Sequence, residues 1–194
     1  MMTSLERDIA GRAEAALEIL RLSETMEYIG EPISQLEHAL QTAYLAERSR
    51  HPEHVIIAAL FHDIGHLIDE DAPQMQHLGT LNHEQLGAQY LGRLGFGENV
   101  RQLVSAHVDA KRYLCYRKPN YYDRLSDASK GTLEHQGGPM EHHEACRFEN
   151  RDDFDMILAL RVFDERAKIV DARVPGLEHY RAMILEHLKT HGGA

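Results

Sequence analysis

The sequence is poor in cysteine and lacks tryptophan: Cys115 and Cys146 are the two cysteines among 194 residues. Two isolated cysteines form neither a disulfide framework nor a cysteine-rich zinc motif, and they fit the reducing cytoplasm, where we expect the protein to reside. No basic-then-apolar leader opens the chain, and no apolar run approaches the roughly 18 residues of a membrane-spanning helix. We therefore expect no membrane partner.

Positive charge is also scarce. Lys and Arg number 21 against 31 Asp and Glu, which gives a formal net charge of −10 at pH 7. An acidic surface repels nucleic-acid phosphates, so we expect no nucleic-acid partner. A small anionic substrate is compatible with this charge, because it responds to the local charge of its site.

The periodicity of apolar residues predicts an all-α fold. No stretch alternates between polar and apolar residues as a half-buried strand does. Helices are predicted at 4–22, 33–49, 53–67, 82–94, 98–114, 127–136, 152–170 and 177–189, with Asn82 and Ser126 as N-caps. The polar residues 137–151 are predicted to be a connection. The length predicts a single domain over residues 1–194, with an outer helix in 1–23 and the core in 24–188.

One predicted helix carries the most informative residues. Residues 55–61 are apolar on every side, so this helix is predicted to be buried, yet His62, Asp63 and His66 follow at once. A buried carboxylate needs a compensating charge, and a metal ion supplies it. In a helix that continues to residue 67, His62 and His66 share one face, while Asp63 points about a quarter-turn away, toward a second ion.

Other helices also direct polar side chains toward the interior. His83 and His107 lie on the apolar arcs of their helices, and Lys111 continues the arc of His107 one turn later. Arg161 and Asp164 lie within the apolar arc of the helix predicted at 152–170. Imidazole and carboxylate without thiolate suit iron, manganese or a catalytic zinc rather than a structural zinc.

Each of these residues also has an ordinary structural explanation. A lone histidine on an apolar face usually donates to a carbonyl group, and Arg161 with Asp164 forms an i, i+3 ion pair. One shared metal site explains all of them together, so we favour it. Periodicity gives no support to His38. The histidines expected to be solvated are His51, His54, His77, His187 and His191.

Several motifs resemble a known family. His38, His62-Asp63 and Asp164 resemble the pattern of the HD-domain superfamily, a group of helical proteins composed mostly of phosphohydrolases. Further segments closely resemble the mixed-valent diiron oxygenases that cleave 1-hydroxy-2-aminoethylphosphonates and are related to myo-inositol oxygenase. These segments are Tyr28-Ile29-Gly30-Glu31, Gln35-Leu36-Glu37-His38, His62-Asp63-Ile64-Gly65-His66, Ala110-Lys111-Arg112-Tyr113-Leu114, Leu125-Ser126-Asp127-Ala128-Ser129 and Gln136-Gly137-Gly138-Pro139-Met140.

The resemblance implies a buried dinuclear site in an HD-domain helical bundle, with two iron ions in the Fe(II)/Fe(III) state and O2 as co-substrate. It assigns His38, His62, Asp63 and Asp164 to one iron and His83 and His107 to the other, with Asp63 bridging. It assigns a gating role to Tyr28, Glu31 and His66, and phosphonate contacts to Lys111, Ser129 and Arg161.

The implied reaction is O2-dependent cleavage of the C–P bond of a small zwitterionic hydroxyphosphonate. We expect 1-hydroxy-2-(trimethylammonio)ethylphosphonate, which would give glycine betaine and phosphate, or its 2-amino analogue, which would give glycine. Candidates for contact with the cationic end are Tyr28, Glu31, Asp69, Asp71, Tyr113, Tyr116, Tyr121 and Tyr122. The alternatives are a binuclear HD-domain phosphohydrolase acting on a nucleotide or other phosphoester, which gives Tyr28 and Glu31 no role, and a non-catalytic metal or ligand sensor.

Overall fold

The computed structural model describes residues 2–69 and 71–192. These residues contain nine α-helices, three short 3₁₀-helices and no strand, which confirms the predicted all-α fold. The α-helices are α1 (Ser4–Leu22), α2 (Gln35–Arg48), α3 (Glu53–Phe61), α4 (His83–Arg93), α5 (Glu98–Arg117), α6 (Asp127–His135), α7 (His142–Glu149), α8 (Phe154–Arg166) and α9 (Leu177–His191). The 3₁₀-helices are η1 (Ser23–Thr25), η2 (Ile64–His66) and η3 (Tyr122–Arg124).

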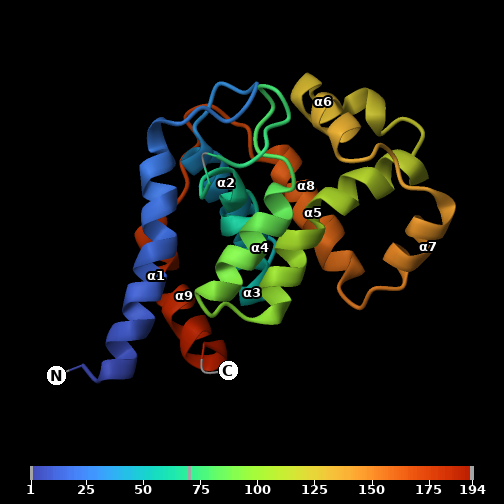
Figure 1. Cartoon of the computed structure of the whole chain (residues 1–194). Coiled ribbons are helices and arrows are strands. Elements are labelled where there is room, and N and C mark those ends of the chain that lie inside the picture. Colours follow the sequence, from blue (N-terminus) through green and yellow to red (C-terminus); the bar gives the residue numbers. More distant parts are fainter. Residues whose placement is uncertain (1, 70, 193–194) are drawn as a thin grey trace.

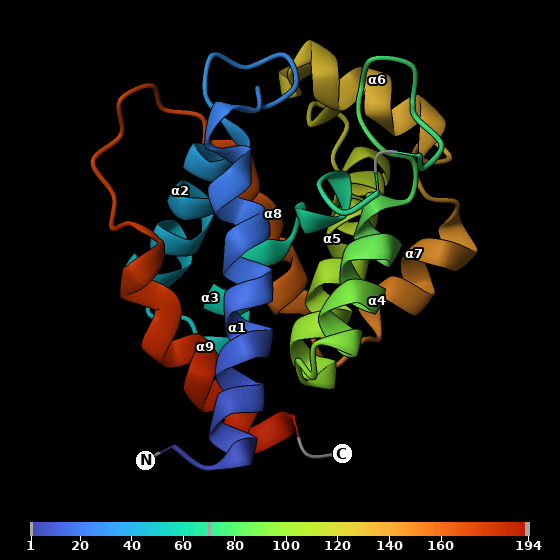
Figure 2. The same ribbon diagram turned by 60° about the vertical axis from the view of Figure 1, so that its left-hand side comes forward.

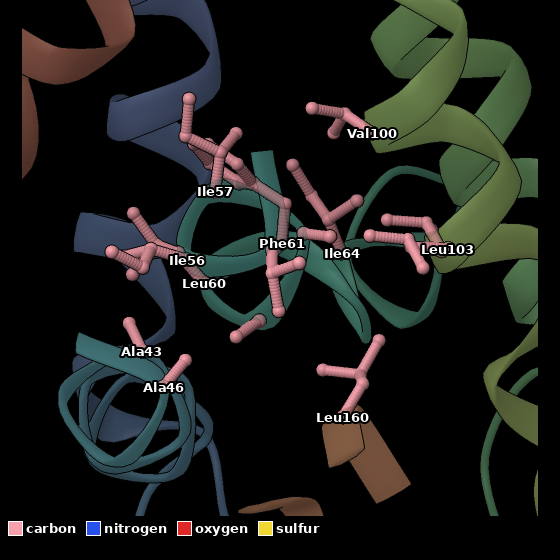
Figure 3. Close-up of a cluster of buried hydrophobic side chains, with 14 of the residues drawn as sticks. Ala43, Ala46, Ile56, Ile57, Leu60, Phe61, Ile64, Val100, Leu103 and Leu160 are labelled. Atoms are coloured by element: carbon pink, nitrogen blue, oxygen red, sulfur yellow. The ribbon is translucent and has the colours of Figure 1, made fainter. Parts of the chain in front are cut away.

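Helix α3 forms the centre of the core. Every residue from Val55 to Phe61 is buried, as the continuous apolar run predicts. Figure 3 shows side chains of α3 and Ile64 of η2 in one cluster with Ala43 of α2, Leu103 of α5 and Leu160 of α8. Full burial of each large apolar side chain contributes about 1.5–3 kcal/mol. The polar residues that follow α3 are therefore held in a rigid interior.

The other helices enclose α3 in a regular order. Helices α2, α5 and α8 pack against it, and α4 packs against α5. Helices α1 and α9 pack against each other on the outside, and both views show them side by side (Figures 1 and 2). No helix among the described residues is long and apolar enough to cross a membrane.

Several helix boundaries differ from the prediction. Helix α3 ends at Phe61, because Asp63 adopts φ −99° and ψ 7°, outside the α region, before η2 begins. Helix α8 ends at Arg166 rather than at residue 170, and α5 extends one turn further, to Arg117. Ser126 caps α6 as predicted, but Asn82 adopts a left-handed conformation and its side chain caps nothing.

Helix α7 was missed by the sequence analysis. It lies in the polar stretch that was predicted to be a connection. Glu141 and Glu144 form a reciprocal capping box at its start, and Ala145 and Phe148 bury its inner face. Two buried residues in eight gave too little periodicity to detect.

One end of the bundle collects most of the irregular segments. The connections at 26–34 and 71–82 lie there beside α6 in both views (Figures 1 and 2). Gly79 in the second connection has φ +90°, which favours glycine, and a Cβ there would stand 2.7 Å from the His66 ring. The end of α3, the start of α4 and the end of α8 meet beneath these connections.

Candidate metal centre

Asp63 lies between two pairs of histidines. Its Oδ2 is 3.3 Å from His62 Nε2 and 3.7 Å from His38 Nε2. Its Oδ1 is 3.4 Å from both His83 Nε2 and His107 Nε2. Each carboxylate oxygen therefore faces a different pair, so the Asp63 side chain joins two half-sites.

The first half-site contains His38, His62 and Asp164. The two Nε2 atoms are 3.2 Å apart, and Asp164 Oδ1 lies 3.4 Å from His38 Nε2. His38 Nδ1 donates to Ala167 O, and His62 Nδ1 donates to Ala59 O, both at 2.9 Å. Because Nδ1 of each ring donates to a carbonyl group, Nε2 is the atom left to bind a metal ion. The bond to Ala59 also satisfies a carbonyl group in the last turn of α3.

The second half-site contains His83 and His107, whose Nε2 atoms are 3.1 Å apart. His107 Nδ1 donates to Val104 O at 2.7 Å, which leaves its Nε2 as the lone-pair atom. His83 Nδ1 is buried and has no hydrogen-bond partner among the described residues; Glu84 Oε2 is 3.7 Å away. The second half-site thus offers two imidazole nitrogens and one oxygen of Asp63.

His66 borders the second half-site without sharing its geometry. Its ring stacks on that of His83 at 3.9 Å, and a ring nitrogen lies within 4.8 Å of the donor atoms of Asp63 and His83. However, His66 Nδ1 accepts a hydrogen bond from the Thr80 N–H at 2.9 Å. The neutral ring therefore carries its proton on Nε2, and the lone pair of Nδ1 is taken by the Thr80 N–H rather than free for a metal ion. The prediction that His62 and His66 share one helix face was wrong, because α3 ends at Phe61, before both residues.

The carboxylates of the centre are held in the charged state. Burial alone would raise the pKa of Asp63, but the charge and hydrogen bonds of His62, His107 and His83 keep it well below its usual range. Burial likewise opposes ionisation of Asp164, and Arg161 and His38 lower its pKa well below the usual range. Although burial disfavours its charged form, the carboxylate of Asp63 raises the pKa of His62 to about 9. In the metal-free protein a proton on His62 supplies the compensating charge.

The donor set fits a pair of metal ions. Donor atoms bound to one ion at about 2.0–2.2 Å lie about 3 Å apart when the bonds meet at right angles. The first half-site has His38, His62 and Asp164 donor atoms within 4.8 Å of one another. Nitrogen and carboxylate oxygen suit iron, manganese or catalytic zinc. A bound ion would replace the proton on His62, so the residues fit the metal centre that the sequence predicted.

Tyr28 covers the first half-site. Its ring stacks on His38 with centroids 3.8 Å apart and planes inclined by 12°, and its hydroxyl lies 3.4 Å from Asp164 Oδ1. Burial, together with the charges of Asp164 and Asp63, raises the pKa of Tyr28 well above its usual range. The neutral hydroxyl therefore donates to Asp164.

A cavity of about 70 Å³ opens over the centre. Its wall includes Tyr28, Asp63 and His66, and it also contains Lys111, Ser129 and Arg161, the three residues predicted to contact a phosphonate. Lys111 Nζ donates to Thr132 Oγ1 at 2.7 Å. Burial, with the nearby charge of Arg161, lowers the pKa of Lys111 to about 7. The cavity wall thus combines the basic side chains of Lys111 and Arg161 with the carboxylates of Asp63 and Asp164.

Arg161 is held by several partners at once. It forms the i, i+3 ion pair with Asp164, and its Nε donates to Glu165 Oε1 at 2.9 Å and Tyr121 OH at 3.1 Å. Tyr121 in turn donates to Glu165. Nη2 is buried and has no hydrogen-bond partner among the described residues. Arg161 therefore forms the ion pair expected of a structural residue and also lines the cavity.

Sequence reasoning missed other cavity residues. Lys168, Thr132, Gln136 and Gln35 also line the cavity. Lys168 follows Asp164 by four residues, and this helical spacing could have identified it as a residue on the same face. In the structure, α8 ends at Arg166, before Lys168. Lys168 Nζ lies 2.6 Å from Glu31 Oε1 and 5.6 Å from the centre of the Tyr28 ring. Glu31 thus reaches the cavity through Lys168.

Most candidates for contact with a cationic group lie elsewhere. Tyr28 lines the cavity, but Asp69, Asp71, Tyr116 and Tyr122 are exposed outside it. Tyr113 donates to Glu149, and Tyr121 lies behind Arg161.

His187, which was predicted to be solvated, is 2% exposed. It was misjudged because α9 packs this residue against the start of α5, where His187 Nε2 accepts a hydrogen bond from the Gly97 N–H at 3.0 Å.

Comparison with known proteins agrees with this geometry. The HD domain model matches residues 35–172. The chain is 41% identical to the [1-hydroxy-2-(trimethylamino)ethyl]phosphonate dioxygenase (glycine-betaine-forming) of Leisingera caerulea, over 87% of this chain and 86% of that protein. It is 36% identical to the hydroxymethylphosphonate dioxygenase of Gimesia maris, over 95% and 93% of the two chains. The chain therefore belongs to the HD-domain family and, within it, to the phosphonate dioxygenases.

Proposed function

We propose that this protein is a diiron oxygenase that cleaves the C–P bond of a small zwitterionic 1-hydroxyphosphonate. The favoured substrate is 1-hydroxy-2-(trimethylammonio)ethylphosphonate, with the 2-amino analogue as the nearest variant. One O2 and one substrate give one phosphate and one carboxylic acid, so that each product gains one oxygen atom. The relative of highest identity given above supports the trimethylammonio substrate.

The proposed ligands divide between two iron ions. His38, His62 and Asp164 hold one ion, His83 and His107 hold the other, and Asp63 bridges them. The single observation that carries this assignment is that the two oxygens of Asp63 face different histidine pairs at 3.3–3.7 Å. When bound, the pair of metals would acidify the substrate hydroxyl and supply the redox chemistry with O2. Nitrogen and oxygen ligands suit manganese as well as iron, so the ligand types do not select the metal. Iron in the mixed Fe(II)/Fe(III) state is therefore part of the proposal.

The remaining cavity residues bind and orient the substrate. Lys111, Ser129 and Arg161 contact the phosphonate, whose dianion needs cations and hydroxyl donors in a dry cavity. Residues Lys111 and Arg161 are 4% and 5% exposed, so water weakens these contacts little. Binding the phosphonate on this side directs the adjacent C1 hydroxyl toward Asp63 and the metals.

Tyr28, Glu31 and His66 control entry to the site. Tyr28 lies over His38 in the described conformation, and it must swing away before a substrate can occupy this side of the centre. His66 is held beside the second half-site by the hydrogen bond from the Thr80 N–H and by the stacking of its ring on His83. Tyr28 supplies an aromatic face and Glu31 a carboxylate for the cationic end of the substrate.

The decisive experiment measures oxygen and phosphate together. The iron-loaded enzyme is supplied with 1-hydroxy-2-(trimethylammonio)ethylphosphonate, and O2 consumption is compared with release of phosphate and glycine betaine. The proposal predicts one O2 per phosphate and no release without O2. Release of phosphate from phosphoesters without O2 would instead identify the binuclear phosphohydrolase. The absence of any metal-dependent turnover would favour the sensor.

A further inference from the structure

The cavity contains a cation that the sequence motifs left unassigned. Lys168 pairs with Glu31 at 2.6 Å, and the two side chains are only 19% and 17% exposed. We propose that substrate binding exchanges this ion pair: the Lys168 ammonium turns to the phosphonate, and the Glu31 carboxylate becomes free for the cationic end of the substrate. This inference rests on the function proposed above and deepens it, because it assigns Lys168 as a specificity-determining residue.

The backbone around Lys168 is fixed from both sides by α2. The preceding residue, Ala167, accepts the hydrogen bond from His38 Nδ1 at 2.9 Å. The following residue, Ile169, is bound through both its N–H and its carbonyl group by the Gln41 side chain, at 3.0 Å each. A change at this position therefore involves the side chain, while the backbone stays with the metal centre.

The side chain is already close to the anion-binding side of the cavity. Lys168 Nζ lies 3.4 Å from Ser126 Oγ, which caps α6, the helix that carries Ser129. Lys168, Lys111 and Ser129 line the cavity, whereas Glu31 does not. Rotation of the Lys168 side chain toward Ser129 would uncover Glu31 to the cavity and place three donors around one phosphonate.

The electrostatics favour a ligand that carries both signs of charge. Separating this partly exposed ion pair leaves two charges without partners, which is unfavourable. A simple anion provides a partner for Lys168 but leaves Glu31 unpaired. A zwitterion provides a partner for each charge, so the opening of the pair is fully compensated. The Lys168–Glu31 pair thus selects for substrates with a cationic group beyond the phosphonate.

Exchange has a thermodynamic signature that a static pair lacks. The pair exists in the free protein and is broken in the complex, so each single substitution removes one ligand contact and also removes the cost of opening. The double variant loses both ligand contacts, but it avoids the cost of separating the pair only once, whereas the two single variants each avoid it. Its affinity loss must therefore exceed the product of the two single losses. We expect an excess of about fivefold, on the scale of a partly exposed ion pair.

The experiment is a double-mutant cycle with Lys168→Gln and Glu31→Gln in the full-length, metal-loaded protein. Binding of 1-hydroxy-2-(trimethylammonio)ethylphosphonate is measured by titration calorimetry without O2, so that no turnover occurs. Lys168→Arg keeps the charge and should retain most of the affinity. Lys130→Gln is the matched control, because Lys130 lies 5.7 Å from the Tyr122 ring and does not line the cavity. Losses that simply multiply would show that the pair persists in the complex and would overturn the inference.

A second measurement guards against misfolded variants. The same cycle is run on the unfolding of the metal-free protein, where the pair should make the double variant less destabilised than the sum of the singles. Additive stabilities would mean that the pair does not form in solution, and the inference would fail. If the affinity losses are coupled as expected but the enzyme releases no phosphate under O2, the proposed reaction alone is refuted. If phosphate is released but the single losses simply multiply in the double variant, the exchange alone is refuted. If the wild-type protein does not bind the substrate, both proposals are refuted.

Discussion

Gly65 lies against the backbone of His83 so closely that a Cβ at position 65 would stand 1.9 Å from the His83 carbonyl oxygen. The same Cβ would lie 2.9 Å from the backbone nitrogen of Gly87. These neighbours are main-chain atoms of α4, which cannot rotate away as a flexible side chain does. The contact brings η2 against the start of α4 and places His83 beside Asp63.

Gly65→Ala should therefore separate the two half-sites. We expect a loss of stability of about 1–3 kcal/mol from overpacking and a fall from two bound metal ions toward one. Thermal unfolding and metal analysis of the purified variant measure the two effects. Gly11→Ala is the matched control, since a Cβ there would meet nothing within 4 Å apart from its chain neighbours and the backbone of its own helix. In the interior of α1 this change should be neutral or stabilising by up to about 1 kcal/mol.

Asp63→Asn should remove both metal ions, because the amide is neutral and only its oxygen can serve as a ligand. Removal of the carboxylate also leaves His83 and His107 without the negative charge that they face. Metal content after loading and dialysis is the measurement. The exposed Asp155→Asn, outside the cavity, should retain both ions. Retention of two ions by Asp63→Asn would contradict the bridging role.

Catalysis should weaken as the pH rises through about 7. Burial lowers the pKa of Lys111 to about 7, so its ammonium is present below that pH and is lost above it. A phosphonate dianion binds the charged form, and kcat/KM reports ionisations of the free enzyme. Lys111→Arg keeps its charge and should remove the fall on the alkaline side. A profile of kcat/KM against pH that is identical in both proteins would exclude Lys111 as the titrating group.

His187 should make the protein less stable in acid. Burial, with the charges of His191 and His54, lowers the pKa of His187 from 6.5 to about 4. The unfolded state therefore binds a proton that the folded state refuses, and stability falls as the pH drops from about 6.5 to 4. The loss approaches roughly 3 kcal/mol. His187→Gln keeps an acceptor for the Gly97 N–H without titrating. Denaturant unfolding at several pH values should show a flatter dependence in this variant than in the wild type, whereas parallel curves would refute the assignment.

The amount that could be predicted differed among the residues of the centre. A buried helix is recognisable from a run of residues that is apolar on every side. The apolar run before His62 therefore predicted both the core and the adjacent polar site. His83, His107, Arg161 and Asp164 followed from the same periodicity. His38 did not, because α2 is packed on two sides, by α3 and α8, and no single arc describes its buried face.

The sequence by itself determined the helical class, the identity of the polar residues that enter the core and, through its motifs, the family. These properties depend on local periodicity and residue type. The tertiary structure alone decided that Asp63 faces two histidine pairs, that the Thr80 N–H occupies His66 Nδ1, and that Lys168 pairs with Glu31. Each of these depends on where the chain leaves its helices and on contacts between segments distant in the sequence, which no local pattern encodes.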